Sequence, residues 1–303
     1  MMDRRRFLGL AAAAATVGIA GCGPEGAGTV RLASGEIGGF YHAFGRKLAA
    51  AAERSGEVRI EPVTTAGSQA NLTLLARGEV DAALALADSV GRSGEQVLAL
   101  GRVYENYLQL AVRADSPIRT VADLRGARVN LGAEGSGAAL TGSRILRAAG
   151  LDPMRDVDVA HRPLRESVAA VINGDADALL WAGGVPTTLL DVPDRMRLID
   201  LGDFATPMRE LFGPVYDRVE VPAAAYPGAA AVHTIGVTNL LLAAPTVSDA
   251  AAAAIVELLV WQADSLVPIE AAGTQFLDGR SLISTGPVPL HPGAAAVYRN
   301  WHG

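Results

Sequence analysis

One local plan occurs twice along this chain. Residues 30–51 (VRLASGEIGGFYHAFGRKLAAA) and 127–150 (ARVNLGAEGSGAALTGSRILRAAG) each have the pattern of a strand, a glycine-rich loop and a helix. Residues 72–86 and 169–183 then share a helix, a glycine, an acidic residue, one variable residue, Asp-Ala and an apolar strand. A chain that carries this plan twice is expected to fold into two similar α/β units.

The second part of each copy supports the same interpretation. Gly78 and Gly174 stand where a helix favours a left-handed residue at its C-terminal cap. The apolar runs that follow are typical of buried parallel strands. Similar segments of this kind also arise by chance in α/β proteins, but the shared Gly-[Glu/Asp]-x-Asp-Ala spacing favours a duplication.

The chain is expected to cross between the two units and later to return. The candidate crossing strands are residues 107–114 and 231–242, both rich in apolar residues. The next helix is predicted over Asp249–Leu266, with Ser248 as its N-cap. This order predicts that the C-terminal part of the chain packs on the first unit.

We therefore predict an α/β fold of two lobes with a hinged cleft between them. Lobe 1 comprises residues 29–111 and 239–303, and lobe 2 comprises residues 112–238. Open α/β sheets bind ligands at the carboxyl ends of their strands, beside helix N-termini. The two glycine-rich loops, SGEIGGFY and GAEGSGAA, are then expected to face each other across the cleft.

The second loop, GAEGSGAAL at residues 132–140, is typical of an anion site at a helix N-terminus. It is not a P-loop, because no lysine follows to reach a terminal phosphate. The dinucleotide fingerprint also fails, because Leu140 stands where the third glycine is required. A tight turn with no ligand is the alternative, and a small anion held between the lobes is the favoured interpretation.

The N-terminus has the pattern of an export signal. A basic start that contains Arg4 and Arg5 precedes an apolar run from Phe7 to Ala20, which is too short to span a membrane. The order Asp-Arg-Arg-Arg-Phe-Leu-Gly resembles a twin-arginine motif, and an ordinary secretory signal is the alternative. We predict that residues 1–21 are a signal peptide.

Cys22 is the single cysteine of the chain, so no intramolecular disulfide can form. Its context, Ile-Ala-Gly-Cys, resembles the lipobox of bacterial lipoproteins, in which the cysteine is lipidated and becomes the mature N-terminus. Residues 22–28 are then a short tether. We expect an exported protein that is lipid-anchored at the outer face of the cytoplasmic membrane or in the periplasm.

The composition limits the ligands and partners. Loss of residues 1–21 removes three arginines and one aspartate, which moves the formal net charge from -6 to -8. An acidic body argues against nucleic-acid binding, and it requires an anionic ligand to be held by local dipoles and a few placed side chains. With 50% hydrophobic residues, the chain has enough apolar sequence for the cores of two lobes.

Segments along nearly the whole mature chain resemble the TAXI solute receptors of tripartite ATP-independent periplasmic (TRAP) transporters. The matching segments are SGEIGGFYHAFG, TTAGSQANLTLLARGEVDAALA, VNLGAEGSGAALTGSRILRAAGL, ADALLWAGGVPT, YPG and VPLHPGAAAVY. The resemblance implies a type II periplasmic-binding-protein fold. It also implies delivery of a small organic anion, such as glutamate or a dicarboxylate, to a TRAP membrane permease. Ala138 and Leu86 stand where the family often has polar residues, which predicts a more apolar cleft and argues against glutamate itself.

The predicted ligand-binding residues lie in four segments at the cleft. Ser136 can offer its hydroxyl and a helix N-terminus to a carboxylate, with a plain N-cap as the alternative. Tyr41 can reach a ligand with its hydroxyl and Trp181 can stack on one, and for both a core position is the alternative. A third helix N-terminus, near Ser68, either binds the ligand or is merely capped. The full set is Gly39, Phe40, Tyr41, Gly67, Ser68, Asn71, Gly135, Ser136, Gly137, Trp181, Gly183 and Gly184.

No catalytic, metal or cofactor site is predicted. The five histidines are scattered without metal-ligand spacing, and no serine has the context of a nucleophile elbow. We expect a monomeric, non-enzymatic receptor for a small carboxylate, with a membrane permease and a lipid anchor as its partners. The alternatives are a receptor for an ATP-driven importer, a sensory ligand-binding module and, least favoured, an enzyme on the same fold.

Overall fold

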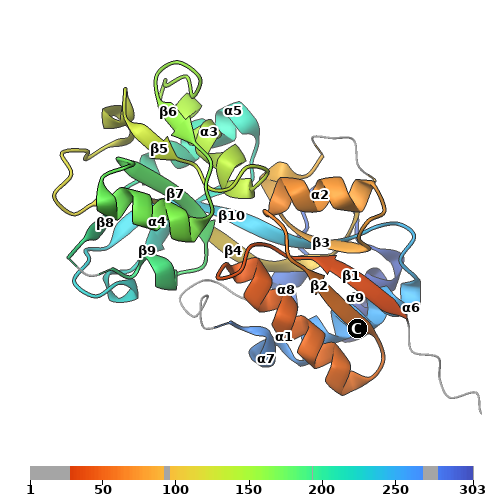
Figure 1. Ribbon diagram of the computed structural model, residues 1–303. Helices are drawn as coiled ribbons and strands as arrows, with labels where there is room; N and C mark the ends of the chain where they lie inside the picture. The colour runs from red at the N-terminus through yellow and green to blue at the C-terminus, as the bar shows by residue number, and fades with distance from the viewer. Residues whose placement is uncertain (1–27, 92–95, 193, 269–278, 303) are drawn as a thin grey trace, which may run out of the picture.

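Two lobes share a pair of long antiparallel strands, β4 (Leu98–Arg113) and β10 (Val232–Ala243), which run from one lobe into the other (Figure 1). The predicted signal peptide and Cys22 lie outside the part of the chain that this computed structural model describes. The described residues are 28–91, 96–192, 194–268 and 279–302.

In the first lobe, the first strand of the chain pairs in parallel with the second strand on one side and with the third strand on the other. β10 then pairs with the third strand in antiparallel orientation. The C-terminal helices return to this lobe, as the chain order predicts (Figure 1). Its strands are β1 (Thr29–Ala33), β2 (Arg59–Val63) and β3 (Ala82–Leu86). Its helices are α1 (Phe40–Ser55), α2 (Ser68–Ala76), α6 (Asp249–Trp261), α7 (Ala263–Leu266), α8 (Gly279–Leu282) and α9 (Pro292–His302), with the one-turn helix η1 (Ala87–Ser89) after β3.

The second lobe repeats the parallel arrangement and adds two antiparallel strands. Its strands are β5 (Arg128–Asn130), β6 (Asp158–Ala160), β7 (Ala178–Gly183), β8 (Met196–Ile199) and β9 (Tyr216–Val221). Its helices are α3 (Gly137–Ala148), α4 (Leu164–Asn173) and α5 (Ala205–Phe212), with one-turn helices η2 (Val121–Leu124), η3 (Thr188–Leu190), η4 (Gly202–Phe204) and η5 (Ala223–Ala225). The main path of the whole sheet is β2-β1-β3-β10-β4-β7-β5-β6.

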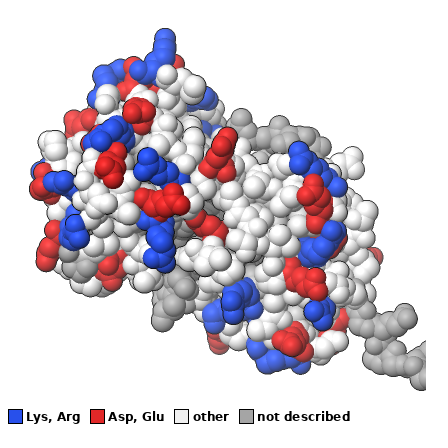
Figure 2. All heavy atoms as spheres, in the orientation of Figure 1, with Lys and Arg blue, Asp and Glu red and all other residues white. Residues whose placement is uncertain are grey.

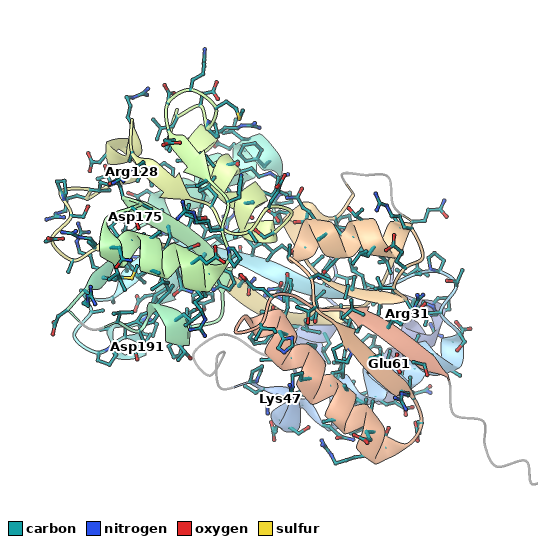
Figure 3. The ribbon with its side chains drawn as sticks, in the orientation of Figure 1. Arg31, Lys47, Glu61, Arg128, Asp175 and Asp191 are labelled. Atoms are coloured by element: carbon teal, nitrogen blue, oxygen red, sulfur yellow. The ribbon has the colours of Figure 1, made fainter. Side chains whose placement is uncertain are left out.

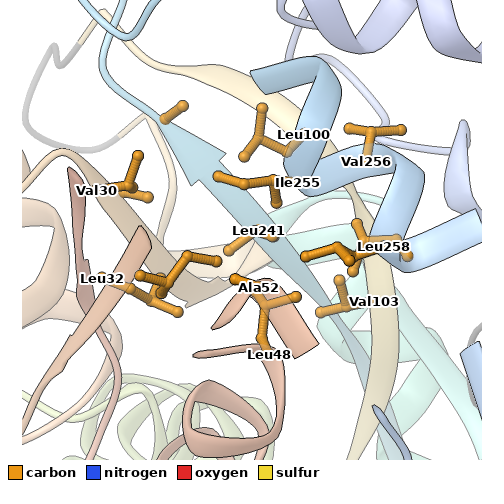
Figure 4. Close-up of a cluster of buried hydrophobic side chains, with 14 of the residues drawn as sticks. Val30, Leu32, Leu48, Ala52, Leu100, Val103, Leu241, Ile255, Val256 and Leu258 are labelled. Atoms are coloured by element: carbon orange, nitrogen blue, oxygen red, sulfur yellow. The ribbon is translucent and has the colours of Figure 1, made fainter. Parts of the chain in front are cut away.

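Each lobe has its own apolar core. In the first lobe, side chains from β1, α1, β4, β10 and α6 form one buried cluster (Figure 4). Leu32, Leu48, Leu100, Leu241 and Ile255 are each at most 1% exposed, and burial of such a side chain contributes about 1.5–3 kcal/mol. Among the helices of the described ranges, none is both long and apolar enough to cross a bilayer.

The two copies build the same polar clamp. Arg31 in β1 donates from its backbone N–H and its guanidinium to Asp81 at 2.8–2.9 Å, and to the carbonyl of the glycine three residues before Asp81. Arg128 in β5 makes the same set of contacts with Asp177 at 2.7–3.1 Å. The two arginines lie in different lobes (Figure 3). The repeated Asp-Ala spacing therefore places each aspartate beside an inner strand of its lobe.

One crossing strand, β4, and the last long helix differ in length from the prediction, whereas β10 has the predicted length and is shifted by one residue. β4 begins at Leu98, nine residues before the predicted start, because its first half pairs with β10 despite containing the charged residues Arg102 and Glu105. The predicted helix 249–266 is two helices, since Gln262 at φ -121° interrupts it. The predicted cap is confirmed: the Ser248 hydroxyl accepts a hydrogen bond from a backbone N–H of α6.

The clamps predict a stability that depends on pH. Hydrogen bonds from the arginines hold the pKa of Asp81 and of Asp177 below the usual value. A carboxyl group whose pKa is lower in the folded chain than in the unfolded chain stabilises the folded state at pH values above the unfolded pKa, which is near 4. This stabilisation is lost as the pH falls through the pKa of the folded state. We expect Asp81→Asn and Asp177→Asn to melt several degrees below wild type at pH 7. Circular dichroism melts should show this difference shrinking as the pH is lowered from 5 towards 3; a constant difference would contradict it.

Candidate functional site

A cavity lies where the two lobes meet. The space enclosed in it is small, about 40 Å³ in this arrangement of the lobes. The β1–α1 loop and the start of α2 line it from lobe 1, the start of α3 and the end of β7 line it from lobe 2, and the shared strand β4 contributes two side chains. Its lining residues are Gly35, Glu36, Gly39, Phe40, Tyr41, Ala66, Gly67, Ser68, Leu86, Tyr104, Asn106, Ser136, Gly137, Ala138, Trp181 and Ala182.

Three helices begin at this cavity. α1, α2 and α3 follow β1, β2 and β5, so each starts at the carboxyl end of a parallel strand. None of the three has an acidic side chain in its first turn. The partial positive charge of each helix end therefore faces the cavity without a carboxylate from its own first turn. This arrangement favours an anionic group.

Ser136 is the N-cap of α3, as one of its two interpretations predicted. Its hydroxyl accepts a hydrogen bond from the Ala139 N–H at 3.1 Å, and the side chain also lines the cavity. A cap accepts with its oxygen and keeps its hydroxyl proton available to donate. Ser136 can therefore cap the helix and donate to a ligand at the same time.

A carbonyl group of lobe 2 caps α2. The Gly135 carbonyl accepts from the backbone N–H groups of Gln69 and Ala70, both at 3.0 Å, and the Gln69 amide donates to the Ser136 carbonyl at 3.1 Å. Gly135, which the sequence analysis placed among the ligand-binding residues, lies outside the cavity lining and fastens the two lobes together instead. These contacts define a closed arrangement of the lobes.

Gly137 permits the close approach of the lobes. A Cβ atom at this position would lie 2.5 Å from Cδ1 of Leu86 and 2.6 Å from Oγ of Ser68. A Cβ atom at Gly67 would lie 3.4 Å from Cα of Ser136. Larger residues at either glycine would hold the lobes apart, so the closed arrangement of the lobes requires glycine at these two positions.

Tyr41 is held by protein groups on both sides of its hydroxyl. It donates to Oδ1 of Asn239, which is fully buried in β10, and its oxygen lies 3.1 Å from Oγ of Ser68. The Ser68 hydroxyl in turn accepts from the Leu86 N–H at 3.0 Å. Burial raises the pKa of Tyr41, so its hydroxyl stays protonated. Tyr41 therefore orients Ser68 and the wall of the cavity.

Trp181 lies in the second half of β7, two residues before its end, and contributes one wall of the cavity. Its ring lies against the start of α1 in the other lobe, because a Cβ atom at Gly39 would be 3.6 Å from two ring carbons. Gly183 gives the indole its space, since a Cβ atom there would be 2.2 Å from Nε1. The Gly184 carbonyl accepts from Nε2 of Gln109 at 3.1 Å. Gly183 and Gly184 support Trp181 and the loop after it, and neither lines the cavity.

Two polar side chains that the sequence analysis did not select line the cavity. Glu36 accepts from the Leu164 N–H at the start of α4, 3.3 Å away in the other lobe. Burial holds the pKa of Glu36 above its usual value. The hydrogen bond from the Leu164 N–H opposes this rise, and the negative charge of Glu166 adds to it. Asn106 is 4% exposed; its Nδ2 donates to the Ala182 carbonyl at 3.3 Å, while its Oδ1 has no hydrogen-bond partner within the described chain.

Most of the predicted residues meet in this cavity. Glu36 lies in the predicted loop SGEIGGFY, so its position gave a signal, whereas Asn106 lies in the half of β4 that the pattern missed. Across the ranges that the structure describes, no group of three or more His, Cys, Asp or Glu side chains is placed to hold a metal ion. The predicted residues that line the cavity are Gly39, Phe40, Tyr41, Gly67, Ser68, Ser136, Gly137 and Trp181.

Asn71, which the sequence analysis placed among the ligand-binding residues, is not part of the cavity lining. It lies within α2 and is fully buried. Its Nδ2 donates to the carbonyls of Ala33, Ser34 and Leu84 at 2.6–3.2 Å. Ala33 and Ser34 lie at the end of β1 and Leu84 lies within β3, so Asn71 ties two neighbouring strands together through their carbonyl groups.

Two α/β lobes that share a pair of long strands and enclose a cavity are the architecture of periplasmic binding proteins. Residues 32–300 match the NMT1-like family. Since this match covers most of the chain, the protein belongs to the NMT1-like family.

Solved structures of other proteins show the same fold. The substrate-binding protein of an amino acid ABC transporter is 16% identical, with 78% of this chain and 95% of that one covered and a TM-score of 0.51. A protein from Bordetella bronchiseptica RB50 is 18% identical, with 90% and 80% covered and a TM-score of 0.53. A putative L-cystine ABC transporter protein from Listeria monocytogenes is 15% identical, with 78% and 92% covered and a TM-score of 0.52. The predicted two-lobed α/β fold is confirmed.

The contacts of Gly137 predict that its replacement opens the molecule. Gly137→Val places a branched side chain against Leu86 and Ser68, so we expect a larger radius of gyration than wild type in solution scattering. Ser143→Val adds a similar side chain to the same helix away from the cavity lining, and it should scatter as wild type does. Equal radii for Gly137→Val and wild type would contradict this role.

Proposed function

We propose that this protein is an extracytoplasmic, lipid-anchored receptor that closes on a small organic anion and delivers it to a membrane permease. The observation that carries the proposal is the convergence of helix N-termini from both lobes on one cavity, without acidic side chains in their first turns. The fold shared with the substrate-binding protein of an amino acid ABC transporter supports this proposal.

We further propose that the permease is of the TRAP type. The sequence segments that resemble TAXI receptors include both glycine-rich loops, and residues from both loops line the cavity. An ATP-driven importer is the second candidate, because one protein of similar fold serves an ABC transporter. Co-purification of the tagged receptor with its membrane partner tests the choice, and capture of an ATP-binding importer would contradict the TRAP assignment.

A binding role fits the cavity better than catalysis. The Ser68 and Ser136 hydroxyls accept hydrogen bonds from backbone N–H groups, no histidine is among the described lining residues, and neither hydroxyl is hydrogen-bonded to the Glu36 carboxylate. Nucleophilic catalysis needs such a base within hydrogen-bond reach of the hydroxyl. We therefore propose a receptor that leaves its ligand chemically unchanged.

A thermal-shift screen of the mature chain tests the proposed ligand class. Monocarboxylates, dicarboxylates, 2-oxo acids and amino acids are the compounds to include. A ligand at 100 times its dissociation constant should stabilise the fold by about 2.7 kcal/mol. For the compound found, Ser136→Ala should weaken binding by about 1.5–3 kcal/mol, the range for a hydrogen bond to a charged group. Ser143→Ala, outside the cavity lining, is the control, and a screen without any stabilising anion would refute the proposal.

The anchor is tested separately, because Cys22 lies outside the described residues. Cys22→Ser removes the thiol that a lipid would modify, so the protein should move from the membrane fraction to the soluble fraction of fractionated cells. Ligand affinity should stay unchanged, since the cysteine precedes the first strand by a short tether. Equal membrane association of wild type and Cys22→Ser would rule out the lipid anchor.

A further inference from the structure

The charges around the cavity are unlike those on the rest of the molecule. Lys and Arg residues alternate with Asp and Glu residues over both lobes in the view of Figure 2. Among the described residues that line the cavity, Glu36 carries the one ionisable acid or base charge, and neither lysine nor arginine is present. A bound dianion would therefore have no cationic side chain beside it.

The positive side of the cavity consists of backbone groups. The starts of α1 and α3 lie at the cavity with no acidic side chain in their first turns, whereas the Gly135 carbonyl already caps α2. Helix N-termini bind one carboxylate well through their N–H groups and their dipole. This part of the cavity can therefore hold a single negative group.

The acceptor side consists of two side chains. Oδ1 of Asn106 is buried and lacks a hydrogen-bond partner in the described chain, while the amide nitrogen of the same side chain is fixed by the Ala182 carbonyl. A buried acceptor without a donor costs free energy, which a ligand N–H group would recover. Glu36 adds a second acceptor that favours a positively charged donor.

The remaining walls are largely apolar. Leu86, Ala138 and Ala182 line the cavity together with the rings of Phe40 and Trp181. These walls can bury the hydrocarbon part of a ligand, and they offer no partner to another charge there. A ligand side chain at this position should therefore be uncharged.

We propose that the ligand is a zwitterion, an α-amino acid with a small uncharged side chain, and that Glu36 is the residue that selects it. The carboxylate of the ligand lies at the starts of α1 and α3, and the ammonium group of the ligand donates to Glu36 and to Oδ1 of Asn106. A second carboxylate is excluded because Glu36 repels it and no cation neutralises it. This inference rests on the proposed function, and it narrows the small organic anion to one charge pattern.

Titration calorimetry with four probes tests the inference on the mature chain. The probes are L-alanine, L-leucine, 4-methylpentanoate, which is L-leucine without its amine, and succinate. Wild type should bind at least one of the two amino acids. It should bind 4-methylpentanoate at least roughly tenfold more weakly than L-leucine if L-leucine is the ligand, the factor expected for the loss of a charged hydrogen bond. Succinate should not bind.

Two variants and one control assign the selectivity. Glu36→Gln should weaken amino-acid binding at least roughly tenfold, while it keeps an oxygen for the Leu164 N–H. Asn106→Leu should also weaken amino-acid binding. With two variants, the test remains decisive if one of them does not fold. Glu166→Gln removes a neighbouring carboxylate outside the cavity lining, so binding should stay as in wild type. Melting curves report the folding of each variant.

The outcomes separate this inference from the proposed function. Binding of succinate, or equal amino-acid affinity in wild type and Glu36→Gln, overturns the zwitterion assignment and leaves an anion receptor in place. The same consequence follows if neither amino acid binds while another anion from the screen does bind. Failure of every class of anion overturns the inference and the proposed function together.

Discussion

The antiparallel pairing of β4 with β10 is the constraint on which the rest of the structure depends. Residues Gly236–Ala243 pair with Leu98–Tyr107, and the two strands then continue into the second lobe, where they pair with β7 and β9. Because the same strands belong to both halves of the sheet, the ends of the parallel strands meet at one place. Helices that start there converge on a common cavity. A direct contact also links this pairing to the site, since Oδ1 of Asn239 in β10 accepts a hydrogen bond from the Tyr41 hydroxyl.

A buried polar network adds a second connection between the lobes. Asp88, after β3, accepts from Thr141 and Arg144 of α3 and from Tyr216 of β9 at 2.8–3.1 Å. Burial raises the pKa of Asp88, and the charge of Arg144 opposes that shift. A buried ion pair adds little net stability relative to apolar packing, but loss of one partner is costly because it leaves a charge without compensation. The network therefore favours one relative position of α3 and β3, the position in which Gly137 meets Ser68.

The site combines features that local sequence predicts with others that it hides. Ser136 as a cap and Gly137 as a close approach follow from the glycine-rich strand-to-helix pattern, which has a local physical cause. Asn71 was misplaced because its role, the satisfaction of carbonyls on two strands, depends on contacts that are distant in sequence. Gly135 was misjudged for a similar reason: whether its backbone binds a ligand or another helix depends on how the lobes dock. Asn106 had no signal, since a polar residue in a mixed strand looks like a solvent-facing position.

The sequence by itself determined the duplicated α/β plan, the glycine-rich turns at the helix starts and the net negative charge of the chain. These properties are local or additive: periodicity, turn chemistry and charge are written residue by residue. Only the tertiary structure decided which of the three helix N-termini stay open to a ligand and which is capped by the opposite lobe. It also decided that Glu36 and Asn106 share one cavity. Those outcomes depend on the pairing of strands far apart in the chain and on the fit between two lobes, and no local pattern encodes such a fit.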